Sequence, residues 1–187
     1  MESTCSVIIG SSGLIGQQLA SSLEEKNTFT VSLNYRKELD SLNHSFIDMT
    51  NKGLFMKLLE DLGKKFNKIN VYFLAGESSV EKSLLNPKSF ENSLISFNNV
   101  IECLKDFHSS LVFASSGAVY DSREKNYFNE KDRLYPPSPY AASKYASEGL
   151  GLAYHETFGV DIRVARIFSV YGETMTRFFL YDLIKKI

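Results

Sequence analysis

Short apolar runs alternate along the chain with longer segments in which apolar residues recur every three or four positions. Runs of the first kind, which are typical of strands, lie at residues 6–10, 29–33, 45–47, 69–75, 110–115 and 160–168. Segments of the second kind, which are typical of amphipathic helices, lie at residues 14–26, 54–66, 87–107 and 139–158. In the second helical segment the predicted apolar stripe comprises Leu54, Phe55, Leu58, Leu59 and Leu62.

This order of elements predicts how the sheet is built. Strands that are separated by helices of this length pair in parallel through right-handed crossovers. Several of the predicted strands are continuously apolar, as expected where helices cover both faces of a sheet. The pattern therefore predicts an α/β fold with a doubly wound parallel sheet and helices on both faces. The polar stretch 121–137 is predicted to be a long loop, and such loops often carry function.

Composition and charge narrow the class of protein. With 187 residues, of which 43% are hydrophobic and 23% charged, one globular domain with its own core is expected. The 21 basic and 22 acidic residues give a net charge of -1, so no overall field attracts nucleic acid or an anionic membrane. No apolar run approaches the ~20 residues of a membrane span. Neither nucleic acid nor a membrane is expected as a partner.

The cysteines and histidines do not suggest a metal site. Cys5 and Cys103 are in no metal-ligand spacing, and they form no disulfide framework. His44, His108 and His155 are far apart in sequence and are expected at the surface or at helix ends. The apolar run after the N-terminus is too short for a signal peptide. We therefore expect no metal and a reduced, cytoplasmic protein.

A glycine-rich turn joins the first predicted strand to the first predicted helix. Its sequence GSSGLIG spaces Gly10, Gly13 and Gly16 three residues apart. In such turns one glycine permits the tight turn, one lets the backbone approach a pyrophosphate, and one lets the helix pack close to the sheet. The free N–H groups at the start of the helix, around Leu14 and Ile15, would then face the phosphate charge. The sequence therefore predicts a Rossmann-like dinucleotide-binding site.

A second constellation carries candidate chemistry. Tyr140 and Lys144 are four residues apart, which places them on one face of the last predicted helix. A fixed ammonium beside a phenol favours the phenolate, which can act as a general base. Ser115 and Ser116 close the strand at 110–115, so their hydroxyls fall at the carboxyl edge of the sheet. Ligands of open α/β sheets bind at that edge.

Over residues 7–172 these motifs resemble the extended short-chain dehydrogenase/reductases, the NAD-dependent nucleotide-sugar epimerase/dehydratase family. The resemblance implies that Tyr140 takes the proton of a sugar hydroxyl, Ser116 holds the sugar oxygen, and Lys144 anchors the cofactor ribose and the phenolate. These three are the expected catalytic residues. The expected cofactor contacts are Gly10, Gly13, Leu14, Ile15, Gly16, Asn34, Arg36, Asp48, Met49, Leu74, Ala75, Gly76, Tyr140 and Lys144.

The resemblance implies NAD or NADP as the cofactor. The segment 34–37, after the second strand, has no carboxylate to bind an adenosine ribose. Arg36 either meets a 2′-phosphate, which favours NADP, or is an exposed charge. Both alternatives stay open.

Other positions match or depart from the family pattern. Asn92, Glu148 and Arg166 match, whereas Ser169 stands where the family usually has asparagine, which puts a substrate contact there in question. The family's sugar 4,6-dehydratases carry an Asp-Glu pair directly after the serine or threonine, and this chain has Gly117 and Ala118 there. Dehydration is therefore disfavoured.

The resemblance implies an NAD(P)-dependent nucleotide-sugar epimerase or ketoreductase that transfers hydride at a sugar carbinol carbon. The alternative is a catalytically silent dinucleotide-binding module that serves as a redox-sensing or scaffolding subunit. The expected partners are a nucleotide-sugar substrate and, as an option, a second copy of the chain in a homodimer.

We expect an NAD(P)-binding domain at residues 1–172 and, at 173–187, the start of a truncated C-terminal part, with the family's substrate domain largely absent. The surface that this domain would cover is expected to expose Phe178, Phe179, Leu180 and Ile184 and to promote self-association. In the alternative, these residues form a terminal helix that packs on its own domain.

Overall fold

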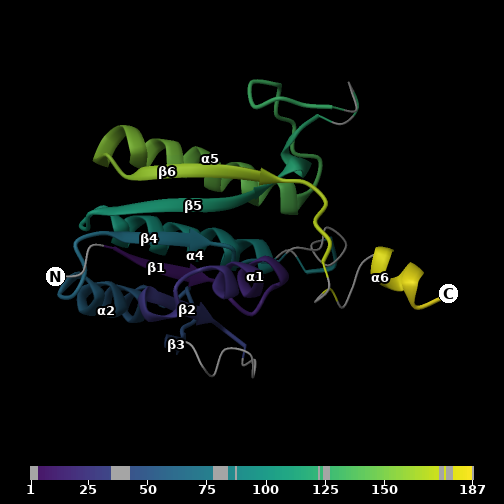
Figure 1. Cartoon of the computed structure of the whole chain (residues 1–187). Coiled ribbons are helices and arrows are strands. Elements are labelled where there is room, and N and C mark those ends of the chain that lie inside the picture. Colours follow the sequence, from purple (N-terminus) through teal and green to yellow (C-terminus); the bar gives the residue numbers. More distant parts are fainter. Residues whose placement is uncertain are drawn as a thin grey trace.

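A six-stranded parallel sheet forms the centre of the molecule, with the strand order β3-β2-β1-β4-β5-β6 (Figure 1). The computed structural model describes residues 4–34, 43–77, 84–86, 88–121, 123, 127–172, 175 and 179–186. The strands are β1 (Cys5–Ile9), β2 (Thr28–Ser32), β3 (Asn43–Phe46), β4 (Ile69–Phe73), β5 (Ser109–Ser116) and β6 (Asp161–Ile167). All five strand pairings are parallel, so the carboxyl ends of the strands lie at one edge.

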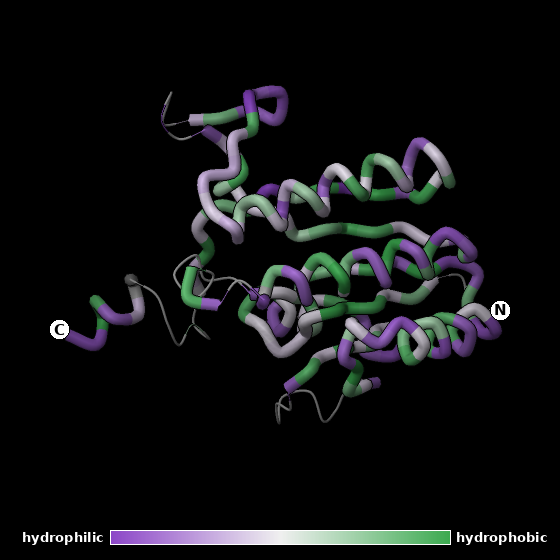
Figure 2. The backbone as a smooth tube through the Cα atoms, turned by 180° about the vertical axis from the view of Figure 1, so that it is seen from behind, coloured by the Kyte–Doolittle hydropathy of each residue, from purple (hydrophilic) through white to green (hydrophobic). Residues whose placement is uncertain are grey.

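Helices cover both faces of the sheet, as the sequence predicts. The helices are α1 (Leu14–Ser22), α2 (Lys52–Gly63), α4 (Lys88–Leu104), α5 (Pro139–Phe158) and α6 (Phe179–Ile184), with short 3-10 turns η1 (Glu25–Asn27) and η3 (Gly117–Val119). α2, α4 and α5 pack side by side on one face, and α1 lies on the other (Figures 1 and 2). The doubly wound α/β prediction is confirmed.

The main core lies between the sheet and the layer formed by α2, α4 and α5. Phe97 of α4 packs its ring against Phe73 of β4 and Phe113 of β5, with centroid distances of 5.6 and 4.5 Å. Val7 and Ile9 of β1 belong to the same cluster, whereas Ile8 points to the α1 side and is also fully buried. In Figure 2 the strands are mostly green, whereas the helices alternate between green and purple. This is the pattern expected for strands buried between two layers.

Two predictions about helices are wrong in detail. The first helix ends at Ser22 rather than Lys26, because Leu23 is already extended and the chain then makes the 3-10 turn η1. Leu54 is 48% exposed and does not belong to the apolar stripe of α2. The buried positions of this helix are Phe55, Leu59 and Leu62. Leu54 precedes Phe55 and is therefore rotated by about 100° around the helix axis, away from the buried face.

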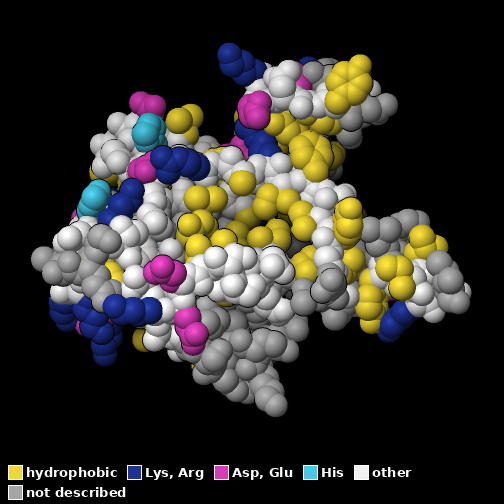
Figure 3. Space-filling model, in the orientation of Figure 1, with side chains coloured by type: hydrophobic (Ala, Val, Ile, Leu, Met, Phe, Trp, Pro, Cys, Tyr) yellow, Lys and Arg dark blue, Asp and Glu magenta, His cyan; other side chains and the backbone are white. Residues whose placement is uncertain are grey.

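The face of β4, β5 and β6 that points away from α4 and α5 is partly exposed. Tyr72, Val112 and Arg163 lie side by side in register on this face, and the partly exposed Ala165 and Ile167 follow on β6. Hydrophobic side chains gather there, and the surface is hollowed (Figure 3). We call this surface the open face. Within the described part of the chain, no helix lies over its β5 and β6 portion (Figure 1).

The last helix, α6, lies apart from the sheet in both views (Figures 1 and 2). Its Leu183 and Ile184 are 43% and 71% exposed. Ile184 is therefore exposed, as expected if these residues form a surface that a further domain would cover. It is not packed on its own domain, which was the alternative. Phe178 lies outside the described residues, as do the side chains of Phe179 and Leu180.

Candidate active site

Two glycines of the turn after β1, Gly10 and Gly16, leave no room for a side chain. Gly10 has φ +90°, in the left-handed region, and a Cβ there would lie 2.7 Å from the backbone nitrogen of Ala75. A Cβ on Gly16 would lie 2.3 Å from the carbonyl oxygen of Gly10. The turn therefore needs glycine at both positions, one for its backbone conformation and both for close approach.

The turn is also tied to the neighbouring strand. The carbonyl oxygen of Val31, in β2, accepts hydrogen bonds from the backbone nitrogens of Gly10 (2.8 Å) and Ser11 (3.2 Å). It also accepts one from the buried Ser11 hydroxyl, at 3.2 Å. Gly13 directly precedes α1, and it is exposed, so the first N–H groups of the helix are accessible there. A pyrophosphate fits this cradle, because the glycines leave room and the helix start supplies donors.

Lys144 connects α5 to the loops at the carboxyl edge. Its Nζ donates a hydrogen bond to the carbonyl oxygen of Ala114 in β5, at 2.8 Å, and lies over the ring of Phe113, 5.1 Å from the centroid. A Cβ built on Gly76 would lie 3.9 Å from this nitrogen, so the loop after β4 is its close neighbour. Burial lowers the pKa of the Lys144 ammonium to about 8. A desolvated cation therefore lies between the loop after β4 and the end of β5.

Tyr140 lies in the first turn of α5, one turn before Lys144. The helix starts there because the Ser138 hydroxyl accepts a hydrogen bond from the Ala141 N–H, at 3.2 Å, and Pro139 occupies the first helical position. Tyr140 is partly exposed and therefore accessible from the carboxyl edge.

Ser116 is the last residue of β5, two residues after the carbonyl group that holds Lys144. Its hydroxyl accepts a hydrogen bond from the Ala118 N–H at 3.2 Å, which leaves its own proton available for donation to a ligand. Ser116, Tyr140 and Lys144 thus come from the ends of two packed elements at one edge of the sheet, as the sequence predicts.

The remaining expected cofactor contacts lie at the same edge. Asn34 follows β2 and is exposed. Asp48 follows β3, is exposed, and accepts hydrogen bonds from the backbone nitrogen (2.9 Å) and hydroxyl (2.8 Å) of Thr50. Met49 is buried. Leu74, Ala75 and Gly76 form the loop after β4, against the glycine turn.

The sequence analysis also singled out Arg36, Asn92 and Ser169. Arg36, on which the choice between NAD and NADP was expected to depend, lies outside the described residues. Asn92 on α4 is exposed, and so is Ser169 after β6.

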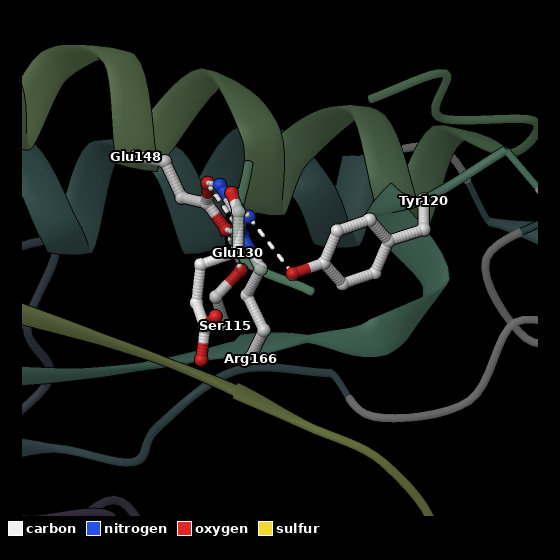
Figure 4. Close-up of polar contacts among 5 residues, drawn as sticks. All are labelled: Ser115, Tyr120, Glu130, Glu148 and Arg166. Atoms are coloured by element: carbon white, nitrogen blue, oxygen red, sulfur yellow. Dashed lines mark hydrogen bonds and ion pairs between the residues drawn. The ribbon is translucent and has the colours of Figure 1, made fainter. Parts of the chain in front are cut away.

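Beside these residues is a largely buried ion pair that the sequence motifs alone did not assign (Figure 4). Arg166 of β6 and Glu148 of α5 are 2.8 Å apart, and their side chains are 19% and 8% exposed. Ser115 donates a hydrogen bond to the same carboxylate, and Arg166 donates one to the hydroxyl of Tyr120 at 2.9 Å. The Glu148 carboxylate raises the pKa of the Arg166 guanidinium. Glu148 is four residues after Lys144 and so lies on the same helix face, but no local sequence pattern connects it to Arg166.

No group of three metal-binding side chains is found among the described residues. Within the same residues, no helix is long and apolar enough to cross a membrane. Cys5 and Cys103 are buried free thiols, and burial raises the pKa of each to about 11. His44 departs from the expectation, since it sits in β3 and its ring nitrogens bond the hydroxyls of Thr30 and Ser32.

Comparisons with known proteins agree with this geometry. The chain is 34% identical over 142 residues to UDP-glucuronate 4-epimerase of Thermodesulfobacterium geofontis, covering 75% of this chain and 43% of that protein. It is 29% identical over 199 residues to UDP-glucuronate 4-epimerase 5 of Arabidopsis thaliana, covering 96% and 46%. The chain thus spans about half the length of the curated relatives that it matches.

Solved structures of related proteins share the fold. UDP-N-acetylglucosamine 4-epimerase from Methanobrevibacter ruminantium, in complex with UDP-N-acetylmuramic acid, superposes with a TM-score of 0.78 at 26% identity, over 92% of this chain and 57% of that one. UDP-glucose 4-epimerase from Brucella ovis, in complex with NAD, gives a TM-score of 0.80 at 17% identity, over 89% and 52%.

A family model decides the classification. Residues 6–187 match the model described as the NAD dependent epimerase/dehydratase family, whose description agrees with the expected nicotinamide cofactor. The match covers nearly all of the chain. The matched residues include the glycine turn, the Tyr140–Lys144 pair and the strands of the parallel sheet. This chain belongs to the NAD-dependent epimerase/dehydratase family.

Proposed function

We propose that this chain is the NAD-binding and catalytic part of a nucleotide-sugar epimerase, with a UDP-sugar as its substrate. The observation that carries the proposal is the position of Lys144, which is held at 2.8 Å by the end of β5, beside the loop after β4, and one turn from Tyr140. The relatives named as UDP-glucuronate 4-epimerases favour epimerisation over simple keto reduction.

In this proposal the glycine turn binds the pyrophosphate of the cofactor, and Lys144 holds its ribose. When bound, the nicotinamide would supply hydride chemistry at the carbinol carbon of the sugar. Tyr140 accepts the hydroxyl proton of the sugar at its phenolate oxygen and later gives it back. The buried Lys144 ammonium favours that phenolate, and Ser116 donates its hydroxyl proton to the sugar oxygen. Gly117 and Ala118 supply no acid for dehydration.

The cofactor site is tested at Gly13. This residue has φ -82° and ψ 167°, which any side chain can adopt, and a Cβ there meets only the carbonyl oxygen of Gly10, at 3.3 Å. Gly13→Asp adds a negative charge to the phosphate cradle, and Gly13→Asn adds a side chain of the same shape without the charge. In a fluorescence titration with NADH, we expect Gly13→Asp to bind at least ~10-fold more weakly than Gly13→Asn, because like charges at this range cost over 1 kcal/mol. Equal affinities would contradict the cofactor site.

The chemistry is tested at Tyr140, in a form of the protein that turns over a UDP-sugar. Tyr140→Phe should lower kcat by at least ~10²-fold, the low end for a positioned acid or base, with little change in the affinity for NADH. Full activity of Tyr140→Phe would refute the assignment of the base. If the wild type bound NADH normally but no form of it turned over a UDP-sugar, the catalytically silent module would be favoured instead.

The expected domain boundary near residue 172, the cytoplasmic location and the homodimer remain proposals.

A further inference from the structure

A single, partly buried guanidinium joins several segments of the chain behind the carboxyl edge (Figure 4). Arg166 donates from Nε and Nη2 to the carboxylate of Glu148, at 2.8 to 3.2 Å. From Nη1 it donates to the hydroxyl of Tyr120 at 2.9 Å and to the carbonyl oxygen of Glu130 at 3.0 Å. The Glu148 carboxylate also accepts the hydroxyl proton of Ser115. β5, β6, α5 and the loop around Glu130 therefore meet at one ion pair.

The ion pair fixes the position of α5 along its axis, which the apolar contacts around it do not. α5 approaches β6 closely at Gly151, where a Cβ would lie 2.6 Å from Cδ1 of Ile162. Such a contact sets the distance between helix and strand, but apolar surfaces fix the shift along the helix axis only weakly. A guanidinium that binds both oxygens of a carboxylate has strict directional requirements. Because desolvation offsets most of the attraction in a buried pair, its main contribution is geometry rather than stability.

The pair is linked to each proposed catalytic residue through one short connection. Ser115 directly precedes Ser116, whose hydroxyl accepts the hydrogen bond of the Ala118 N–H. Glu148 lies one turn after Lys144 and two turns after Tyr140, on the same face of α5.

The same guanidinium holds the aromatic cluster beside Ser116. Its carbon Cζ lies 5.0 Å from the centroid of the buried Tyr120 ring. Tyr120 stacks on Phe128 at 4.8 Å and on Phe168 at 6.1 Å. A Cβ on Gly117 would lie 2.7 Å from the Phe168 ring, so this ring packs directly on the residue after Ser116. A shift of Arg166 would therefore move the surroundings of Ser116 from two sides.

We propose that Arg166 and Glu148 are positioning residues. They fix α5 against the end of β5 and hold the loop at 127–135, so that Ser116 and Tyr140 face the same substrate oxygen. The catalytic meaning of this arrangement rests on the proposed function, whereas the mechanical linkage itself does not.

Hydrogen exchange of single amides tests the linkage without any activity measurement. The Ala118 amide reports the position of the Ser116 hydroxyl, and the Tyr135 amide, which donates to the Val119 carbonyl oxygen at 2.9 Å, reports docking of the loop. The Leu74 amide, bonded to Ile9 in the sheet at 2.9 Å, reports global opening. In Arg166→Lys, which keeps the charge but loses the planar fork, we expect exchange at Ala118 and Tyr135 to accelerate at least ~10-fold more than at Leu74.

Glu148→Gln serves as the second variant, and Glu102→Gln as the matched control. Glu102→Gln removes a carboxylate that bonds Lys52 at 2.6 Å between α2 and α4, and neither residue belongs to an element that the Arg166–Glu148 pair joins. We expect Glu148→Gln to act like Arg166→Lys, and Glu102→Gln to leave the exchange of Ala118 and Tyr135 unchanged. A merely structural pair would instead accelerate all three reporter amides equally, through global unfolding, and that result would overturn the inference.

NADH titration of the wild type separates this inference from the proposed function. If the wild type did not bind NADH, the proposed function would fail, and the exchange data would still decide whether Arg166 and Glu148 position the loop and β5. If NADH bound normally and the two local amides did not respond, only the positioning role would be refuted.

Discussion

Lys144 combines two properties that oppose each other at the level of a single residue. Its ammonium is useful because it is fixed at the end of β5 and desolvated, which strengthens its effect on a neighbouring phenol. The same desolvation lowers its pKa to about 8, below the usual 10.5, so the protonated form costs folding free energy. Lys144 is thus expected to lower the free energy of unfolding, while its ammonium favours the proposed reaction.

We predict a pH-dependent gain in stability from Lys144→Met. The folded protein binds fewer protons than the unfolded chain between pH 8 and 10.5, so the wild-type free energy of unfolding rises with pH across this window through this residue. The free energy of unfolding of the variant should therefore exceed that of the wild type most below pH 8. This difference should shrink by at most about 3 kcal/mol on going to pH 10.5.

Urea unfolding of both proteins at several pH values measures this difference. The buried thiols of Cys5 and Cys103, with pKa values raised to about 11, lower stability at high pH in both proteins and cancel in the comparison. A stability difference that did not change between pH 7 and 10.5 would contradict the prediction.

At the level of elements, α5 carries Tyr140 and Lys144, two of the three proposed catalytic residues, and both of its ends are well defined. Ser138 caps its first turn, and Gly159 ends it with φ +71°, donating a hydrogen bond to the carbonyl oxygen of His155 at 2.9 Å. Because Tyr140 lies in the first turn, fraying of that end would move the phenol before any other part of the helix changed.

We predict that Ser138→Ala lowers the free energy of unfolding by about 1 kcal/mol, since the Ala141 N–H loses its acceptor. Ser138→Asp should keep the wild-type value, because a carboxylate accepts the same hydrogen bond and interacts favourably with the helix dipole. Ser143→Ala is the control, since the Ser143 hydroxyl only bonds a backbone carbonyl within the helix. Urea unfolding checks all three variants, and equal stabilities of Ser138→Ala and Ser143→Ala would show that the cap contributes nothing.

Elements and local motifs were predictable from sequence to different degrees. The strands, the long helices and the parallel topology follow from periodicity, and the glycine turn and the Tyr140–Lys144 spacing are local patterns. The end of α1 carries no glycine or proline signal, so its early stop was missed. The Arg166–Glu148 pair joins residues on different elements, and its formation depends on the register of β6 against β5. No local pattern contains that information.

At the level of the whole molecule, the described chain contains both the proposed cofactor cradle and the proposed catalytic residues, but it also exposes apolar surface. The open face of β4, β5 and β6 and the exposed side chains of α6 are the main examples (Figure 3). Exposed apolar patches on soluble domains mark sites that other surfaces cover.

We predict that the 187-residue chain self-associates through these surfaces. Ile184→Glu should weaken association at least ~10-fold, because burying an isoleucine contributes about 1.5 to 3 kcal/mol. Sedimentation at several concentrations measures the change. The matched control is Leu152→Glu, at a residue of α5 that is 60% exposed on the other side of the sheet. A larger effect of Leu152→Glu would identify the outer surface of α5 as the contact instead.

The attachment of the glycine turn to Val31 also affects how fast a dinucleotide can bind. Three donors converge on one carbonyl oxygen, so the shape of the turn is fixed when the sheet forms. Ligand binding then has no entropic cost for ordering this segment, and it does not require a prior conformational change of the turn. Association at the pyrophosphate end should therefore follow simple one-step kinetics, and any slow phase in NADH binding would arise elsewhere in the site.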